Sequence, residues 1–216
     1  MRLFVTMTSD FICPWCFIGE RKLFDAIAPL PADVQVGVSY RPFELNPDMP
    51  AEGRDRKEYR SAKFGSWAKS QAMDAQVASA GKAVGLDFNY DWVKRTPNTM
   101  LAHRLMWAMA YEGGDQGVLA TRLFTAYFTD GLDLSDHAVL RRIAVEAGLS
   151  EERADAVLDG DLGAAEVHAL TREAYAKGIH GVPLFEIGSA TLSGAQPVEV
   201  IEDALRRALK LQAAIA

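Results

Sequence analysis

The only two cysteines among the 216 residues, Cys13 and Cys16, lie in the segment DFICPWCFIG with Pro14 and Trp15 between them. Two thiols at this spacing suit three kinds of chemistry. They can supply half of a zinc site, close a small structural disulfide, or form a reactive pair that exchanges electrons with other thiols. The rest of the sequence has to decide among these three.

A structural zinc ion takes four ligands, so two of the four histidines would have to complete a site that begins with the cysteine pair. The histidines are scattered, and no two of them are three to five residues apart: His103, His137, His168 and His180. A structural disulfide would close a very short loop, for which the chain-entropy model gives only about 1.9 kcal/mol. Both alternatives are therefore disfavoured.

A reactive dithiol accounts for the position of the pair as well as for its spacing. We expect Cys13 at the N-terminal edge of a helix, where free N–H groups and the helix dipole favour a thiolate. A thiol pKa lowered from about 8.5 to about 6 makes the sulfur mostly ionised at neutral pH. Cys16, one turn further in, should be more buried and able to resolve a mixed disulfide. Pro14 suits a first helical turn, and Trp15 offers either an aromatic surface beside the sulfur or simple packing.

A proline at the far end of the chain supports the dithiol interpretation. In HGVPLFEIG, Pro183 opens a returning strand, and X-Pro bonds are the ones that readily adopt the cis isomer. If this bond is cis, the backbone of Val182 becomes an edge that can pair with an extended peptide or hold a thiol ligand. The alternative is an ordinary proline at a strand edge.

The elements that must position these residues follow from the apolar pattern. RLFVTMT (2–8) and VQVGVSYRPF (34–43) have the composition and alternation of strands. Between them, a helix begins at CPWC and stops at Pro29 and Pro31. This order predicts a βαβ unit with two parallel strands.

Residues 55 to about 177 have helical character throughout, in about five or six helices, one of them capped at Ser135. GVPLFEIG and ATLSGA, separated by Gly188 and Ser189, then predict a hairpin, and a last helix begins near Pro197. The predicted fold is α/β, with a four-stranded mixed sheet and an all-helical insertion. We divide the chain into a discontinuous sheet domain (1–54 and 178–216) and a helical insertion domain (55–177).

Composition and charge exclude several classes of protein. The chain is about half apolar with a net charge of −6, and it has no Lys- or Arg-rich run of the kind that binds nucleic acid or anionic membranes. Polar residues interrupt the N-terminal apolar stretch, which predicts a strand rather than a signal peptide, and no run approaches the roughly 18 apolar residues of a membrane span. We therefore expect a cytoplasmic protein, in which a persistent structural disulfide would be unusual.

CPWC after a first strand and GVP before a third, on either side of a helical block, resemble the DsbA-like branch of the thioredoxin superfamily. RPFELNPDMPAEG, PNTMLAHRL, LFTAYFTDGLDL and SGAQP resemble its FrnE-type members, a cytosolic group often described as protein disulfide isomerases or oxidoreductases. The resemblance extends along nearly the whole chain. It implies a thioredoxin-like fold, with Cys13 as the nucleophile, Cys16 as the resolving thiol and Pro183 as a cis-proline facing them.

The resemblance also implies that two further segments border the same groove. They contain Phe43 and Asn46 in FELNP and Asn98 in PNT. Asn46 and Asn98 could equally cap helices and pack the domain junction. His103 fits a hydrogen-bonded core position better than a catalytic base, and His180 could either tune Cys13 or face solvent.

The leading hypothesis is a cytosolic thiol–disulfide oxidoreductase or protein disulfide isomerase that acts on protein or small-molecule disulfides and thiols. It requires no cofactor or metal, although glutathione is a possible co-substrate. An alternative is a glutathione-dependent transferase or isomerase acting on a small aromatic molecule, since kappa glutathione transferases and 2-hydroxychromene-2-carboxylate isomerases resemble this chain but typically have serine in place of Cys13. A third alternative is a peptide-binding holdase. The sequence does not distinguish a monomer from a homodimer.

Overall fold

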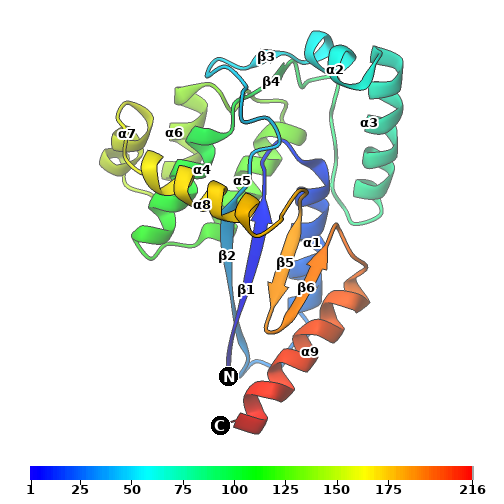
Figure 1. Cartoon of the computed structure of the whole chain (residues 1–216), viewed down its shortest axis with the longest axis vertical. Coiled ribbons are helices and arrows are strands. Elements are labelled where there is room, and N and C mark those ends of the chain that lie inside the picture. Colours follow the sequence, from blue (N-terminus) through cyan, green and yellow to red (C-terminus); the bar gives the residue numbers. More distant parts are fainter. Residues whose placement is uncertain (216) are drawn as a thin grey trace.

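The computed structural model describes residues 1–215 and contains a four-stranded sheet in the order β2-β1-β5-β6 (Figure 1). Its strands are β1 (Arg2–Ser9), β2 (Gln35–Pro42), β5 (Leu184–Ile187) and β6 (Ala190–Ser193). β1 is parallel to β2 and antiparallel to β5, and β5 and β6 form a hairpin around Gly188 and Ser189. The predicted mixed sheet, βαβ unit and hairpin are therefore confirmed.

Nine helices lie within residues 1–215, and none of them is both long enough and apolar enough to cross a membrane. They are α1 (Pro14–Ile27), α2 (Arg56–Phe64), α3 (Trp67–Lys82), α4 (Met100–Tyr111), α5 (Gln116–Phe128), α6 (His137–Glu146), α7 (Glu151–Leu158), α8 (Ala164–Ala176) and α9 (Val198–Ile215). Helices α2 to α8 gather around the upper end of the sheet in Figure 1, whereas both termini lie at the lower end.

The expectation that residues 55–177 are entirely helical in five or six helices is wrong in two respects. Seven helices form, because Gly65, at a φ of 87°, ends α2, and the Ser66 hydroxyl accepts from Lys69 N to begin α3. A two-stranded ladder also joins β3 (Arg54–Asp55) to β4 (Arg95–Thr96). Strands of two residues are too short to show a period, so the apolar pattern could not reveal them.

The predicted cap of α6 at Ser135 is also wrong, because Asp136 is the capping residue. Its carboxylate accepts from Ala138 N at 2.8 Å and from Val139 N at 3.4 Å. Ser135 instead belongs to the preceding turn, where its N–H donates to the side chain of Asp133 at 2.9 Å. The division into a sheet domain and an insertion domain stays a prediction.

Helix α1 joins the sheet to the helical block through aromatic contacts. Phe17 stacks with Phe124 and Phe128 of α5 at centroid distances of 5.4 and 6.2 Å. One turn away from these contacts, the carboxyl group of Glu20 is buried between β2 and α5. It accepts from Tyr40 Oη at 2.6 Å and from Thr121 Oγ1 at 3.1 Å. A titratable group is thus built into the helix that begins at Cys13.

Burial raises the pKa of Glu20 from 4.5 to about 7, and the hydrogen bonds from Tyr40 and Thr121 oppose this shift. Between these two values the folded protein binds more protons than the unfolded chain, so the free energy of unfolding should fall as pH rises from about 4.5 to about 7. We expect Glu20→Gln to remove at most about 3 kcal/mol of this pH dependence, as measured by urea unfolding at pH 5 and pH 8.

The exposed Glu199→Gln variant is the control for this measurement, because its carboxyl group lies at the surface. It should retain the wild-type difference between the two pH values. An equal pH dependence in wild type and Glu20→Gln would contradict the assignment.

Candidate active site

The cysteine pair lies where β1 ends and α1 begins, as the sequence predicts. Cys13 is the N-cap of α1, with extended backbone angles, and Pro14 is the first helical residue. The Cys13 N–H donates to the carbonyl of Asp10 at 3.0 Å, and the Cys16 N–H donates to the carbonyl of Cys13 at 3.0 Å. The N-terminal, positive end of the helix dipole therefore lies at Cys13.

The two thiols are free and differ in their surroundings. Cys13 has 5% of its surface exposed and Cys16 has none, so the predicted order of burial is confirmed. Burial raises the pKa of the Cys16 thiol well above its usual range, and the hydrogen bond and charge interaction with Cys13 act in the same direction. Cys16 is thus held as a protonated thiol behind Cys13.

The loop before β5 meets Cys13 at the edge of the sheet. The Val182–Pro183 bond is cis, and the Cys13 thiol donates to the carbonyl of Val182 across 3.5 Å. Pro183 is buried against α1, where Gly19 allows the close approach. A Cβ atom at Gly19 would lie 3.0 Å from Pro183 Cγ and 3.0 Å from Phe185 Cζ. Val182 and Pro183 therefore lie beside the thiol, as the family resemblance implies.

Asp10 is a site residue that the sequence analysis missed. Its carboxylate is fully buried, accepts from Leu45 N at 2.7 Å and from Ile12 N at 3.4 Å, and lies 3.7 Å from His103 Nε2. It therefore ties the turn before Cys13 to the segment after β2. An acidic residue three positions before the first cysteine was the available signal, but only the fold shows that it is buried.

His103 is a hydrogen-bonded core residue. Its Nε2 lies 3.1 Å from the carbonyl oxygen of Phe43, which can only accept, so Nε2 carries the proton and donates. The ring of Phe43 is buried and contacts Tyr175 at a centroid distance of 5.0 Å. The buried Phe43 ring therefore anchors the segment that follows β2, and it offers little surface to a substrate.

The side chains of Asn46 and Asn98 hold the same segment in place. Asn46 Oδ1 accepts from Tyr59 Oη of α2 at 2.6 Å, and Asn98 Nδ2 donates to the carbonyl of Met49 at 2.7 Å. Asn98 Oδ1 also accepts from the N–H of Met100, the first residue of α4, at 2.8 Å, although the N-cap residue itself is Thr99. These bonds fit the packing alternative for both residues, and their role in a groove stays a prediction.

The surface around Cys13 is mixed. Trp15 is 42% exposed beside the sulfur, Leu45 and Tyr175 are also exposed apolar residues, and His180 faces solvent. Burial raises the pKa of nearby Glu44, while the charge of His103 acts in the opposite direction. Within residues 1–215, no three His, Cys, Asp or Glu side chains converge as a metal site. The chemistry that this arrangement can perform is exchange at sulfur.

Comparisons with known proteins agree with this geometry. The DSBA-like thioredoxin domain family matches residues 5–206. A probable DsbA oxidoreductase from Streptomyces coelicolor is 31% identical, with a TM-score of 0.84 over 96% of this chain and 90% of that one. The uncharacterized protein YwbO of Bacillus subtilis is 28% identical over 207 residues, 95% of this chain and 96% of that protein.

Two more distant structures share the fold. They are a 2-hydroxychromene-2-carboxylate isomerase (14% identity, 99% of both chains, TM-score 0.71) and the cytosolic disulfide reductase DsbM from Pseudomonas aeruginosa with GSH (16% identity, 99% of both chains, TM-score 0.63). The family match begins at Val5 within β1 and covers the cysteine pair, the cis-proline loop and the hairpin. The chain therefore belongs to the DsbA-like thioredoxin family.

Proposed function

We propose that this protein is a cytosolic thiol–disulfide oxidoreductase or protein disulfide isomerase of the FrnE type. The observation that carries the proposal is the asymmetry of the dithiol. Cys13 caps α1 and contacts Val182, whereas Cys16 is fully buried with a raised pKa. Cys13 is thus placed to act as the nucleophile, and Cys16 is placed to resolve the mixed disulfide afterwards.

In the proposed reaction, the Cys13 thiolate attacks one sulfur of a substrate disulfide. A Cys13–substrate disulfide forms, the substrate S–S bond breaks, and the other substrate sulfur leaves as a thiolate. Cys16 then loses its proton to solvent and attacks the Cys13 sulfur, which releases the second substrate thiolate. The substrate gains two electrons in all, its two thiolates take up protons from solvent, and the enzyme becomes the Cys13–Cys16 disulfide.

The N-terminus of α1 and the cis-proline loop assist different parts of this cycle. Negative charge is stabilised at the first turn of a helix, which favours the attacking and departing thiolate of Cys13. The backbone at Val182 lies beside Cys13 and can pair with an extended substrate segment. Trp15, which is exposed in the first turn of α1, adds an apolar contact surface.

Glutathione is the proposed thiol that returns the oxidised enzyme to the dithiol. Two glutathione molecules would reduce the Cys13–Cys16 bond and leave as glutathione disulfide, so no bound cofactor is required. The fold shared with a cytosolic disulfide reductase that was solved with GSH supports this choice of thiol for a first test. A reducing cytosol favours reduction or isomerisation over net oxidation.

Turnover of a model protein disulfide tests the nucleophile. Cys13→Ser should lower the rate by about 100-fold or more, because the sulfur that forms the mixed disulfide is removed. The measurement is insulin reduction with glutathione and glutathione reductase as the recycling system. A Cys13→Ser rate equal to that of the wild type would refute the proposed function.

Trapping tests the resolving role of Cys16. Cys16→Ala retains Cys13 but cannot break the mixed disulfide, so a covalent enzyme–substrate species should accumulate and disappear on addition of dithiothreitol. Non-reducing gels with mass spectrometry would detect it, and the double Cys13→Ser, Cys16→Ala variant is the matched control. If Cys16→Ala turned over at the wild-type rate without accumulation, Cys16 would have no resolving role.

Alkylation kinetics test the difference between the thiols. Below pH 8 we expect Cys16 in Cys13→Ser to react with iodoacetamide at least about 10-fold more slowly than in 8 M urea, because burial limits access and raises its pKa. Cys13 in Cys16→Ser should be the faster of the two native thiols. Equal native rates for the two variants, measured by mass spectrometry, would contradict the assigned order.

A further inference from the structure

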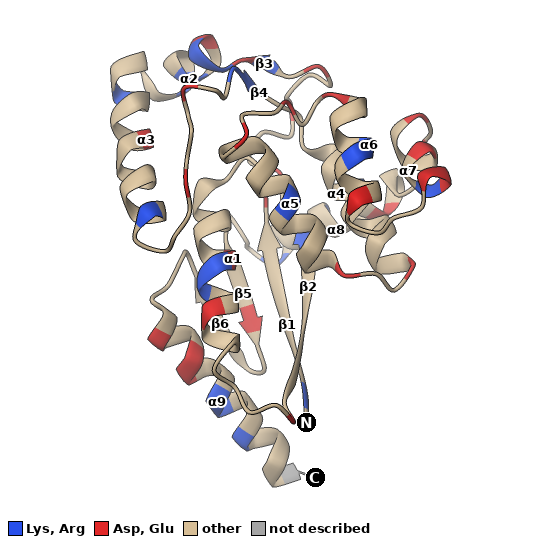
Figure 2. Cartoon of the chain, turned by 180° about the vertical axis from the view of Figure 1, so that it is seen from behind, with Lys and Arg blue, Asp and Glu red and all other residues tan. Residues whose placement is uncertain are grey.

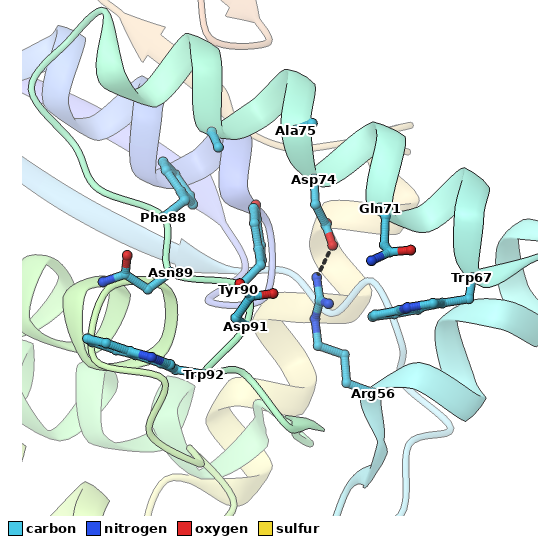
Figure 3. A pocket seen from close by; sticks show the side chains of 11 residues that line it. Arg56, Trp67, Gln71, Asp74, Ala75, Phe88, Asn89, Tyr90, Asp91 and Trp92 are labelled. Carbon is cyan, nitrogen blue, oxygen red and sulfur yellow. Dashed lines mark hydrogen bonds and ion pairs between the residues drawn. The ribbon is translucent and has the colours of Figure 1, made fainter.

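A cavity of about 340 Å³ lies between α3 and residues 88–92, and neither cysteine lines it. Four aromatic side chains form much of its wall: Trp67, Phe88, Tyr90 and Trp92. In Figure 3, Trp67 and Trp92 lie at opposite ends, with Tyr90 and Arg56 between them. The volume is at the lower end of the range for small-molecule sites.

In the buried part of this cavity's surroundings, positive side chains outnumber negative ones. Arg56 Nη2 donates to Asp74 Oδ2 at 2.7 Å, and Arg60 Nη2 donates to Asp74 Oδ1 at 2.9 Å, so two guanidinium groups share one carboxylate. The side chains of Arg56 and Asp74 are 4% and 10% exposed. Burial lowers the pKa of Arg60; the charge of Asp74 opposes this shift, and the smaller effect of the Arg56 charge adds to it.

Arg56 has hydrogen-bonding capacity left over. A guanidinium group carries five N–H donors, yet within residues 1–215 its Nη2 makes the only side-chain hydrogen bond of Arg56. Nε and Nη1 are therefore free to donate, and Arg56 lines the cavity. A nearly buried cation with spare donors in a fixed fork is suited to a carboxylate.

One acidic residue besides Asp74 lines the cavity. Asp91 is exposed at the rim, and its side chain makes no ion pair with a residue of the described chain. Helix α2, which contributes Arg56 to the cavity, carries Arg56, Lys57, Arg60 and Lys63 against the single acid Glu58, and Figure 2 shows blue segments on this helix beside a red one. Solvent weakens the field of Asp91 more than that of the buried guanidinium.

The walls favour a flat ligand. The Arg56 guanidinium already stacks over Tyr90 at 4.9 Å and over Trp67 at 5.7 Å, so the aromatic faces hold it in a fixed plane. Trp92 is 60% exposed, which is unusual for so large an apolar side chain, and it lines the cavity. A ring packed against Trp92 and Tyr90 would cover this surface.

We propose that this cavity binds a small planar aromatic carboxylate, with the carboxylate on Arg56 and the ring against Tyr90 and Trp92. The site is separate from the dithiol, since neither Cys13 nor Cys16 lines the cavity; its wall residue Phe88 contacts Phe17 of α1 at a centroid distance of 5.7 Å. The proposal therefore adds a ligand site to the proposed function and does not depend on it.

Isothermal titration calorimetry with 2-naphthoate tests the proposal on the whole protein. The uncharged isostere 2-naphthamide should bind at least about 10-fold more weakly, because it cannot form the charged pair with Arg56. Trp92→Ala should weaken 2-naphthoate binding by about 5-fold, and Asp91→Asn should tighten it by about 3-fold by removing the rim carboxylate. Both residues are exposed, so these variants should fold.

Trp15→Ala is the matched control, because Trp15 is the exposed tryptophan beside the dithiol. It should leave the affinity for 2-naphthoate unchanged. Equal affinities for naphthoate and naphthamide, no binding at millimolar concentration, or a loss of binding in Trp15→Ala but not in Trp92→Ala would overturn the proposal.

Discussion

The antiparallel pairing of β5 with β1 is the constraint on which the site depends. Because Thr8 pairs with Leu184, the residues just before β5 must lie beside the residues just after β1. Cys13 and Val182, which are 169 positions apart in sequence, thereby come within 3.5 Å. A shift of one residue in this register would turn the side chains of β5 to the other face and separate the thiol from the loop. β1 is also parallel to β2, so the segment after β2 emerges at the same edge.

Two buried side chains fix the turn that carries Cys13. The Asp10 carboxylate accepts from the backbone N–H groups of Ile12 and Leu45. His103, on α4, donates to the carbonyl of Phe43. Buried polar groups stabilise a fold only where each finds a partner, and here the partners are the backbone groups that shape the entry to α1. Asp10 thus connects the residues after β1 to those after β2, and through His103 both lie against α4. The proposed chemistry requires this rigidity, since a thiolate and a disulfide react only when their sulfurs are aligned.

Helix α1 carries the dithiol, packs into the core and contacts Phe88 of the cavity wall. Its first turn holds the cysteines, Phe17 faces the aromatic residues of α5 and Phe88, and Gly19 lets Pro183 approach. Glu20 adds a buried carboxyl group whose raised pKa makes stability depend on pH near neutrality. The helix therefore cannot shift to suit one of these contacts without disturbing the others, because packed interiors leave few voids.

The sequence by itself determined the local features. The proline after Cys13, the alternation of apolar residues in 34–43 and the glycine-serine turn predicted the helix start, the strands and the hairpin, because such signals act over a few residues. It also ranked Cys13 above Cys16 as the more exposed thiol. Only the tertiary structure decided that Asp10 is buried against Leu45 and that Arg56 and Arg60 share Asp74, since these contacts join segments whose separation no periodicity encodes. The reason is physical: burial and pairing of charges depend on where distant parts of the chain meet, and that is set by packing.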